Sequence, residues 1–505
     1  MQLYLFNFLL LLLCFSVFIS TVSSLSSDGL ALLSLSKHWT SVPASISSSW
    51  SASDATPCQW VGIECDNAHN VVTLNLTGYG IFGQLGPEVG SFRHLQTLDL
   101  SVNKFSGELP KSLNSLENLF SGGLPPGLGN CSNLTQFSAV GSNLEGTIPS
   151  SFGQLRYLSI LYLPLNNLSG KIPPELGKCE SLKKLHLYKN QLVGEIPGEL
   201  GMLTQLEDLE LFENQLTGEI PVSIWKIQSL QHVLVYNNSL TGELPIVMTE
   251  LKQLKNISLF NNLFFGVIPQ TLGINSSLWQ LDFTNNKFTG KIPPNLCRGK
   301  QLRVLNLGFN QFQGTIPSDV GNCSTLRRLK LEQNNLIGVL PQFAKNSSLS
   351  YMDISNNEIS GEIPSSLGNC SNLTVINLSM NNLTGVIPQE LGSLAELGSL
   401  TLFKNNLVGP LPPRLSNCTK MDKFDVGSNL LNGSIPSSLR SWTDLSTLIL
   451  SDNNFIGGIP PFLSEFEKLS ELQLGGNFLG GAIPSSIGAL VRFLQSWGSW
   501  QDYND

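Results

Sequence analysis

The sequence predicts a solenoid, in which short coils stack in order and each coil adds one strand to a single parallel sheet. The first observation is a pattern, L-x-x-L-x-L-x-x-N-x-L-x-G-x-I-P, that recurs every 24 residues through most of the 505-residue chain. The second is its phase. The asparagines of the pattern are 24 residues apart from Asn166 to Asn334, and after one step of 23 they resume from Asn357 to Asn477. Self-similarity with this period and pattern is the leucine-rich repeat signature.

One clean repeat, Leu182–Gln205, shows why the coils must stack. Leu185 and Leu187 alternate with polar residues, which predicts a short strand with one buried face. Asn190 follows the strand, where a buried amide can satisfy backbone groups of the turn and of the adjacent coil. One coil cannot bury its own leucines, but stacked coils bury them against each other. We therefore expect an α/β-type leucine-rich repeat solenoid with a parallel β-sheet on its concave face.

The chain begins with two segments that are not repeats. Residues 1–24 form an apolar run that ends in small residues, which indicates a secretory signal peptide, with an uncleaved membrane anchor as the alternative. Residues 25–70 are expected to cap the first coil. Ser27 or Asp28 can N-cap a short leucine-rich helix. Cys58 and Cys65 are predicted to form a disulfide, because close cysteine pairs in secreted proteins are usually bridged.

The repeats span residues 71–493, and two places break their regularity. The third repeat is truncated to residues 119–133 and lacks the segment that would form its strand. Either the sheet is interrupted there or coding segments have been lost, and we favour the second interpretation. Residues 494–505 form a non-repeat tail without a cysteine-pair cap. After residue 24 no stretch approaches 18 apolar residues, so no spanning helix is expected.

Most of the other cysteines are expected to be free. Five of them share one position in the repeat, three residues before a coil's first apolar residue: Cys131, Cys179, Cys323, Cys370 and Cys418. No two of the five fall in adjacent repeats, and coils further apart are too distant for a disulfide. We interpret them as buried thiols that act as small apolar side chains. Cys297 is off this register and stays unassigned.

Asn-x-Ser/Thr sequons are frequent, and in a secreted chain they are candidates for glycosylation on an exposed surface. The alternative is that a repeat rich in Asn, Ser and Thr generates them by composition. The candidates are Asn75, Asn133, Asn167, Asn237, Asn256, Asn275, Asn322, Asn346, Asn372, Asn382, Asn417 and Asn432.

Composition and motifs exclude several classes of function. The net charge of −8 and the lack of a Lys/Arg run argue against nucleic-acid binding. The chain carries no phosphate loop, kinase signature or metal-ligand cluster, so we expect no catalysis, no metal and no cofactor. A binding protein is the class that remains.

Solvent-facing strand positions of successive coils predict where a ligand would bind. One column reads Tyr188, Phe212, Tyr236 and Phe260, which we expect to form an exposed apolar stripe. Acidic residues of one coil lie beside it, and a Trp, an Asp, several Arg and Lys330 follow in later coils. An extended peptide across the strands would place apolar groups on the stripe, basic groups on the acidic patch and its terminal carboxylate on an Arg. The candidate residues besides the stripe are Glu207, Asp208, Glu210, Glu213, Trp279, Asp282, Arg303, Arg327 and Arg328. The alternatives are that the aromatics only shield neighbouring strands and that the charges form an ordinary solvated face.

Several strings in the chain resemble a known family. "SSDGLALLSLSKHWTSVP", "ATPCQWVGIECD" and "GQLGPEVG" look like the N-terminal cap and first coil of plant leucine-rich repeat receptor kinases. "SIWKIQSLQHVLVYNNSLTGELPIVMTELKQLK" and "PPNLCRGKQLRVLNLG" look like the ectodomain of the receptors for endogenous plant elicitor peptides. The L-x-G-x-I-P half-repeat resembles the plant-specific class of repeat, whose coils add a second short strand and build a curved right-handed superhelix.

The resemblance implies a plasma-membrane immune receptor whose extracellular part binds a short basic peptide and recruits a SERK-type co-receptor kinase. Full-length relatives are Ser/Thr kinases, but kinase activity is not expected here, and a membrane would be reached only through a segment missing from this chain. The resemblance thus implies an extracellular, apoplastic location for these residues. Two alternatives stay open: a secreted inhibitor of pathogen cell-wall-degrading enzymes, and a soluble decoy receptor.

Overall fold

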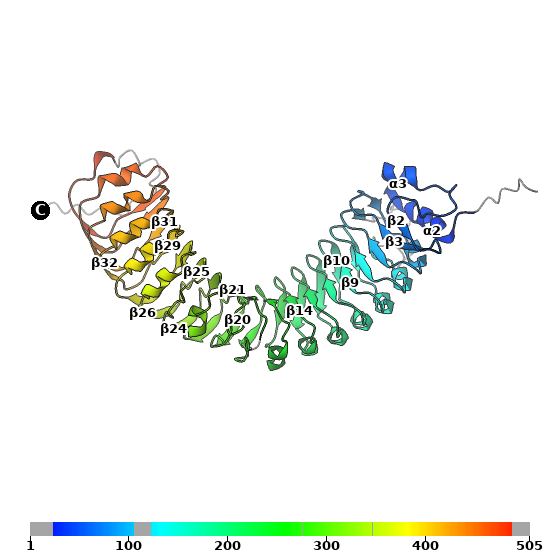
Figure 1. Cartoon of the computed structure of the whole chain (residues 1–505), viewed down its shortest axis with the longest axis horizontal. Coiled ribbons are helices and arrows are strands. Elements are labelled where there is room, and N and C mark those ends of the chain that lie inside the picture. The colour runs from blue at the N-terminus through cyan, green and yellow to red at the C-terminus, as the bar shows by residue number, and fades with distance from the viewer. Residues whose placement is uncertain (1–23, 106–122, 275, 346, 487–505) are drawn as a thin grey trace, which may run out of the picture. The chain divides into compact units, whose positions relative to one another are not determined.

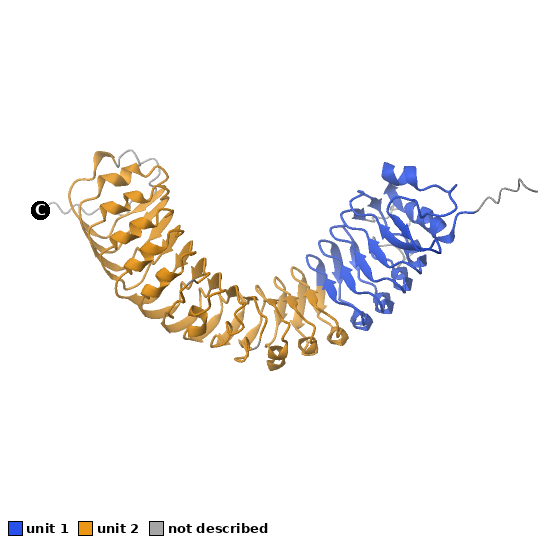
Figure 2. Ribbon diagram, viewed as in Figure 1, with its two compact units in different colours: residues 1–192 blue, residues 193–505 orange. Residues whose placement is uncertain are grey.

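The computed structural model describes residues 24–105, 123–274, 276–345 and 347–486. The expected signal peptide and the expected 494–505 tail therefore lie outside the described residues, apart from Ser24. The chain divides into two compact units, Met1–Leu192 and Val193–Asp505 (Figure 2). Each unit is a stack of coils (Figure 1). No helix among the described residues is long and apolar enough to cross a bilayer.

In the first unit, one strand per coil builds a parallel main sheet. Strand β2 pairs antiparallel with β3, and the following pairs are parallel. The strands of this sheet are β2 (Ile63–Cys65), β3 (Val71–Asn75), β5 (Thr97–Asp99), β7 (Gln136–Ser138), β9 (Ile160–Tyr162) and β11 (Lys184–His186). The antiparallel strand β2 covers the edge of β3, which would otherwise be open to pairing with another chain.

Shorter strands and helices complete each coil of the first unit. The short strands are β1 (Trp39–Ser41), β4 (Phe82–Gly83), β6 (Lys104–Phe105), β8 (Glu145–Thr147), β10 (Asn167–Gly170) and β12 (Gln191–Glu195), whose last residues belong to the second unit. The helices are α2 (Ser27–Ser36), α3 (Ala44–Ser49) and four 3₁₀ turns, η1 (Pro87–Ser91), η2 (Pro126–Asn130), η3 (Ser150–Gln154) and η4 (Pro174–Lys178). Proline precedes or opens each of the last three turns, because it fixes the φ angle and lacks an N–H that would need a partner.

The second unit repeats this design in a constant register. Leu209, Val233, Ile257 and Leu281 pair in turn along its main sheet, so equivalent residues of successive coils lie side by side. The strands of this sheet are β13 (Asp208–Glu210), β15 (His232–Leu234), β17 (Asn256–Ser258), β19 (Gln280–Asp282), β21 (Val304–Asn306), β23 (Arg328–Lys330), β25 (Tyr351–Asp353), β27 (Val375–Asn377), β29 (Ser399–Thr401), β31 (Lys423–Asp425), β33 (Thr447–Ile449) and β35 (Glu471–Gln473).

The second strands that the L-x-G-x-I-P half-repeat predicts are present. In the second unit they are β14 (Gln215–Glu219), β16 (Ser239–Thr241), β18 (Phe265–Val267), β20 (Lys287–Gly290), β22 (Gln311–Gly314), β24 (Asn335–Val339), β26 (Glu358–Glu362), β28 (Asn382–Thr384), β30 (Val408–Gly409), β32 (Leu430–Gly433), β34 (Asn454–Gly457) and β36 (Phe478–Leu479). Its helices are η5 (Gly198–Met202), η6 (Ile224–Lys226), η7 (Ile246–Glu250), α4 (Ser318–Gly321), η8 (Ser365–Asn369), η9 (Gln389–Ser393), η10 (Pro413–Asn417), η11 (Ser437–Ser441) and η12 (Pro461–Glu465).

The repeated asparagines form the predicted internal ladder. The amide of Asn334 is 9% exposed, and its Nδ2 donates to the carbonyl oxygens of Leu307, Leu331 and Glu332 at 3.0, 3.1 and 3.2 Å. Its Oδ1 accepts from the backbone N–H of Phe312 at 2.9 Å. Each asparagine therefore joins its own turn to the preceding coil, which explains why a polar residue recurs inside an apolar core.

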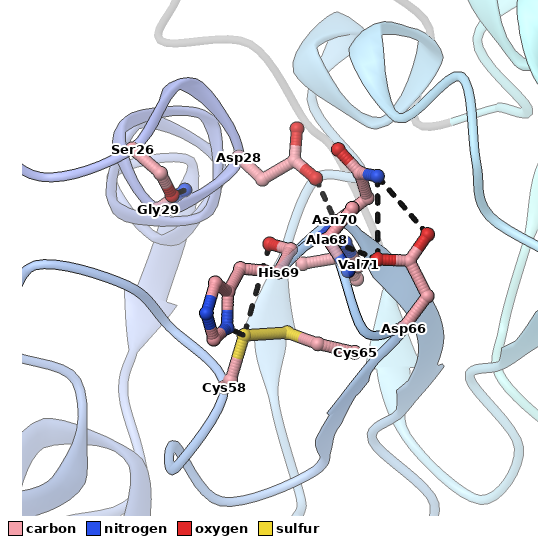
Figure 3. Close-up of a disulfide and its surroundings, with 10 residues drawn as sticks. All are labelled: Ser26, Asp28, Gly29, Cys58, Cys65, Asp66, Ala68, His69, Asn70 and Val71. Carbon is pink, nitrogen blue, oxygen red and sulfur yellow. Dashed lines mark hydrogen bonds between the residues drawn. A yellow bond between two sulfur atoms is a disulfide. The ribbon is translucent and has the colours of Figure 1, made fainter.

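The N-terminal cap contains the predicted disulfide between Cys58 and Cys65, whose Cα atoms are 5.4 Å apart (Figure 3). Three tryptophans of the cap pack together. The ring centroids of Trp39 and Trp50 lie 5.7 Å apart with tilted planes, and those of Trp50 and Trp60 lie 5.6 Å apart in a stack. The expected N-cap was wrong by at least one residue. Ser26 caps helix α2, because its Oγ accepts from the N–H of Gly29 at 3.3 Å.

The carboxylate of Asp28 has another role. It accepts from the N–H of Val71 at 2.9 Å and thereby fastens helix α2 to strand β3 (Figure 3). This bond gives the cap a polar attachment to the first coil besides its apolar packing. A carboxylate that accepts from a backbone N–H makes a stronger bond than a neutral acceptor does.

The shortened third repeat does not interrupt the main sheet. Strand β5 pairs directly with β7 in full register, with Leu98 opposite Phe137. The sheet interruption considered from the sequence is therefore wrong among the described residues. The segment between these strands includes residues 106–122, which lie outside the described part of the chain. The loss of coding segments stays a prediction.

Two cysteines correct the expectation that all five thiols in register are free. Cys297 and Cys323 form a disulfide, with Cα atoms 5.7 Å apart. The prediction failed because it compared only cysteines at the same coil position, whereas these two lie 26 residues apart in adjacent coils. The other four, Cys131, Cys179, Cys370 and Cys418, are buried free thiols, as predicted.

Candidate ligand-binding face

The solvent side of the main sheet, here called the main-sheet face, presents the same few positions from every coil. Counting the first apolar residue of a coil as position 1 and the ladder asparagine as position 9, the residues at positions 3, 5 and 7 alternate with core residues and point to solvent. Because the register is constant, each position forms a column along the sheet. Columns of this kind can contact an extended ligand that crosses many strands.

Three of the four predicted aromatics form a regular stack at position 7 of the second unit. The ring centroids of Phe212 and Tyr236 lie 4.3 Å apart at an interplanar angle of 12°, and those of Tyr236 and Phe260 lie 4.2 Å apart at 13°. Phe212 is only 8% exposed, so the expectation of four exposed aromatics is wrong for this residue. Each ring is shielded by its neighbours, and the stack offers ring edges and one terminal face at Phe260.

The fourth predicted aromatic, Tyr188, belongs to the first unit and is half-buried. Its ring centroid lies 6.2 Å from that of His186, which in turn stacks on Tyr162 at 4.3 Å. Sequence reasoning missed Tyr162, although it occupies the same column as His186 one coil earlier. A search for aromatics in every solvent-facing column would have found it.

The predicted acidic patch is partly buried. Asp208 is 8% exposed, which contradicts its expected place on the surface, while Glu207, Glu210 and Glu213 are half-buried. The Oε2 atom of Glu207 accepts from Nε2 of Gln231 at 3.4 Å. The negative charge of this coil is therefore held close to the sheet, beside the first ring of the stack.

An open hollow of about 420 Å³ adjoins the last ring of the stack. Its lining residues come from four successive coils: Phe260, Gln280, Asp282, Thr284, Val304, Asn306, Arg328 and Lys330. The structure thus brings together three residues of the predicted site, Phe260, Asp282 and Arg328. Lys330, which was expected to follow them on this face, also lines the hollow. The other four were missed, although they occupy positions 3, 5 and 7 in the same coils and could have been found by extending the columns.

The acidic side of the hollow is fixed by hydrogen bonds. Oδ2 of Asp282 accepts from Nδ2 of Asn306 at 2.7 Å, and Oδ1 accepts from the N–H of Thr284 at 3.2 Å. These bonds hold the carboxylate in one orientation. A positioned carboxylate suits a ligand that offers N–H donors or a cation.

The basic side is built around Arg328 and Lys330. The guanidinium of Arg328 lies 4.6 Å from the ring centroid of Tyr351, a cation–π contact that orients it. Nζ of Lys330 lies 2.8 Å from Oε1 of Glu332. Glu332 is 5% exposed, and burial raises its pKa above the usual range against the opposing influence of Lys330.

The remaining predicted residues do not line the hollow. Trp279 is half-buried, whereas Arg303 and Arg327 are exposed at position 2, before their strands begin. They lie on three of the four coils that line the hollow but are not among its lining residues. Arg327 and Arg328 are adjacent in sequence, yet only the second reaches the hollow.

The asparagines of the candidate glycosylation sequons differ in their exposure to solvent. The amide of Asn256 is 9% exposed on strand β17, so its expected place on an exposed surface is wrong. Asn237 is half-buried, and its Oδ1 accepts from Nδ2 of Asn261 at 2.7 Å. Asn275 and Asn346 lie outside the described residues. The remaining candidates are exposed: Asn75, Asn133, Asn167, Asn322, Asn372, Asn382, Asn417 and Asn432.

The main-sheet face brings together several groups that can contact a ligand. Within the described ranges, no group of three or more His, Cys, Asp or Glu could hold a metal ion. The arrangement offers an apolar stack, an oriented carboxylate and two cations in one line. This set of groups can bind an extended chain of mixed chemistry.

Family models match several parts of the chain. The leucine rich repeat N-terminal domain matches residues 25–66, and leucine rich repeat models match residues 347–407 and five further segments between residues 94 and 466. A receptor-like protein kinase of Ipomoea nil is 53% identical over 90 residues, and the kinase PEPR1 of Arabidopsis thaliana is 53% identical over 95. Each of these alignments covers 18% of this chain and 8% of the relative.

Solved structures match over nearly the whole chain. The crystal structure of PEPR1 with AtPEP1 is 43% identical with a TM-score of 0.72, and the match covers 92% of this chain and 87% of that one. The Arabidopsis receptor kinase HAESA, in complex with the peptide hormone IDA and the co-receptor SERK1, is 30% identical with a TM-score of 0.66, covering 93% and 92%. The chain belongs to the plant leucine-rich repeat receptor-like kinases and corresponds to their ectodomain. Within that family, it is similar to receptors solved with peptide ligands.

Proposed function

We propose that this chain is the peptide-binding part of a plant immune receptor, and that it recognises a short basic peptide released on damage. The observation that carries the proposal is the continuity of the aromatic stack with the hollow in the second unit. Aromatic side chains bury large areas at a low cost in conformational entropy, which makes them effective anchors for a ligand. The similarity to PEPR1 with AtPEP1 supports the choice of a peptide as the ligand.

Charge supports a basic ligand. The net charge is −8, and four acidic residues gather in the coil of strand β13, at the start of the stack. Basic groups of the peptide would approach this coil, and apolar groups would rest on Tyr236 and Phe260. Arg328, which lines the hollow, would meet an acidic group of the ligand.

The proposal is tested by titrating AtPEP1 against the wild-type chain and a Tyr236→Ala/Phe260→Ala variant by isothermal calorimetry. We expect affinity to fall by about 30-fold or more, as for the loss of central aromatic anchors. The control is Phe265→Ala, which removes an exposed ring (42%) on strand β18, away from the main sheet. Equal affinities for all three proteins would contradict the site.

We further propose that a bound peptide recruits a SERK-type co-receptor and that a kinase in the longer protein signals from the plasma membrane. The support is the HAESA complex, which contains SERK1 together with its peptide. Size-exclusion chromatography of the chain with a SERK1 ectodomain should show a complex only when AtPEP1 is present. A complex that forms equally without peptide would contradict this order of assembly.

A further inference from the structure

The position-7 column continues beyond Phe260 through five coils without a bulky projecting side chain, and this stretch is here called the trough. The next residues are Thr284, Gly308, Glu332, Ser355 and Ser379. Glu332 is long but does not project, because it is 5% exposed and folds over Gly308. A Cβ atom on Gly308 would lie 2.6 Å from the carboxyl carbon of Glu332, so only glycine leaves room for this arrangement. Five successive coils therefore present no bulky side chain in this column.

An apolar pair ends the trough. Phe403 is the next aromatic in the column and is half-buried, and Met380 beside it is 40% exposed. The two residues are adjacent in space, because the N–H of Met380 donates to the carbonyl oxygen of Phe403 at 2.7 Å. Met380 has a φ angle of 54°, like the residue before the ladder asparagine in neighbouring coils, so its position is set by the coil. An exposed methionine adapts its shape to an apolar partner.

The position-5 column beside the trough carries polar side chains that form hydrogen bonds with each other. Nδ2 of Asn377 donates to Oδ2 of Asp353 at 3.0 Å, which repeats the bond between Asn306 and Asp282 three coils earlier. Lys330 lies between these two pairs and is bonded to Glu332. A column of oriented donors and acceptors suits a peptide backbone or polar side chains better than apolar ones. The trough is therefore polar in the middle and apolar at both ends.

The two apolar ends are separated by a fixed distance. Six strand steps, from β17 to β29, correspond to about 29 Å at the usual strand spacing of about 4.8 Å. An extended chain advances about 3.3 Å per residue, so about nine residues span that distance.

We propose that Met380 and Phe403 form a second apolar subsite, and that the ligand is an extended peptide with two apolar side chains about nine residues apart. One apolar side chain contacts the terminal face of the stack at Phe260, and the other contacts Met380 and Phe403. The intervening residues are small or polar. This inference rests on the proposed function, since it assumes a peptide on the main-sheet face. Unlike the proposed function alone, this inference requires that the ligand extends beyond the coil of Arg328 towards Met380 and Phe403.

A displayed library of random 20-residue peptides, selected on the wild-type chain, tests the spacing without a known ligand. Enriched sequences should carry two apolar residues eight to ten positions apart. Enriched peptides without such a pair would overturn the second subsite and leave the proposed function standing. Enrichment of no peptide at all would overturn both.

Variants of the second subsite give an independent test with AtPEP1 as the probe. Met380→Ala/Phe403→Ala should weaken AtPEP1 binding about 10-fold or more. Met380→Glu should weaken it as well, and this change at an exposed side chain leaves the core intact. The matched control, Phe265→Ala/Val267→Ala, removes two exposed apolar side chains from strand β18 and should leave binding within about 2-fold. Loss of binding in Tyr236→Ala/Phe260→Ala with full binding in both Met380 variants would show a ligand that ends before this subsite.

Discussion

The interior of the coils and the main-sheet face are built from the same repeat but follow different rules. Inside, the buried backbone groups of each turn are satisfied in the same way, by an asparagine that joins its own turn to the preceding coil. On the face, equivalent positions carry a phenylalanine, a glycine, a glutamate or a serine in successive coils. Identity between coils therefore marks stability, whereas variation between coils marks the surface that can distinguish ligands.

The largest effect should come from breaking the ladder beside an unchanged surface. Asn334→Ala removes an amide that makes four hydrogen bonds, and we expect it to destabilise the protein by about 3 kcal/mol, because buried carbonyl groups lose their donors. Asn335→Ala, one residue later and exposed, should change stability by less than about 0.5 kcal/mol. Urea unfolding monitored by circular dichroism measures both. Similar losses for the two variants would contradict the distinction between interior and face.

A smaller effect, on affinity rather than stability, should separate two adjacent arginines of the face. Arg328 lines the hollow and packs on Tyr351, whereas Arg327 is exposed and lies outside the hollow. Arg328→Ala should weaken AtPEP1 binding about 10-fold, or about 1.4 kcal/mol. Arg327→Ala should change it by less than about 3-fold. Calorimetry on both variants measures this difference, and a larger loss for Arg327→Ala would show that the hollow is not the site.

The smallest effect should appear in the pH dependence of stability, at the buried carboxylate of Glu332. Burial raises the pKa of Glu332, although Lys330 opposes this shift. The folded protein therefore holds the proton of Glu332 more tightly than the unfolded chain does, so this residue lowers stability as pH rises above the ordinary value of 4.5.

Glu332→Gln removes the titrating group, and the variant should gain stability relative to wild type as pH rises from 4.5 towards 7. Thermal melts across this range measure the trend. Gly308→Ala should weaken the same pH dependence by displacing the carboxylate into solvent, since the new Cβ would lie 2.6 Å from the carboxyl carbon. A stability difference between wild type and Glu332→Gln that does not change with pH would contradict the argument.

The interior could be predicted almost completely from the sequence. The 24-residue period places Asn334 and its equivalents and the core leucines, because each coil repeats the same contacts. The second strands followed from the resemblance to the plant-specific class of repeat. The disulfide between Cys297 and Cys323 was missed, since it joins two different coil positions and the period says nothing about such pairs. Ser26 was missed as the helix cap because three neighbouring residues could all serve in this role.

The face could be predicted only in outline. The columns follow from strand alternation, and they correctly place Phe260, Asp282 and Arg328 around one hollow. The exposure of each side chain depends on its neighbours in the adjacent coils, which the pattern does not contain. Phe212 and Asp208 are therefore buried where exposure was expected.

The central claim is that the ligand lies on the main-sheet face of the second unit. Hydrogen–deuterium exchange of the chain with and without AtPEP1 tests it most directly. The account predicts that AtPEP1 slows exchange in segments that include Tyr236, Phe260, Asp282 and Arg328, with little change in the second strands β14 to β26. Slower exchange confined to those second strands, or to the 3₁₀ turns, would contradict the account.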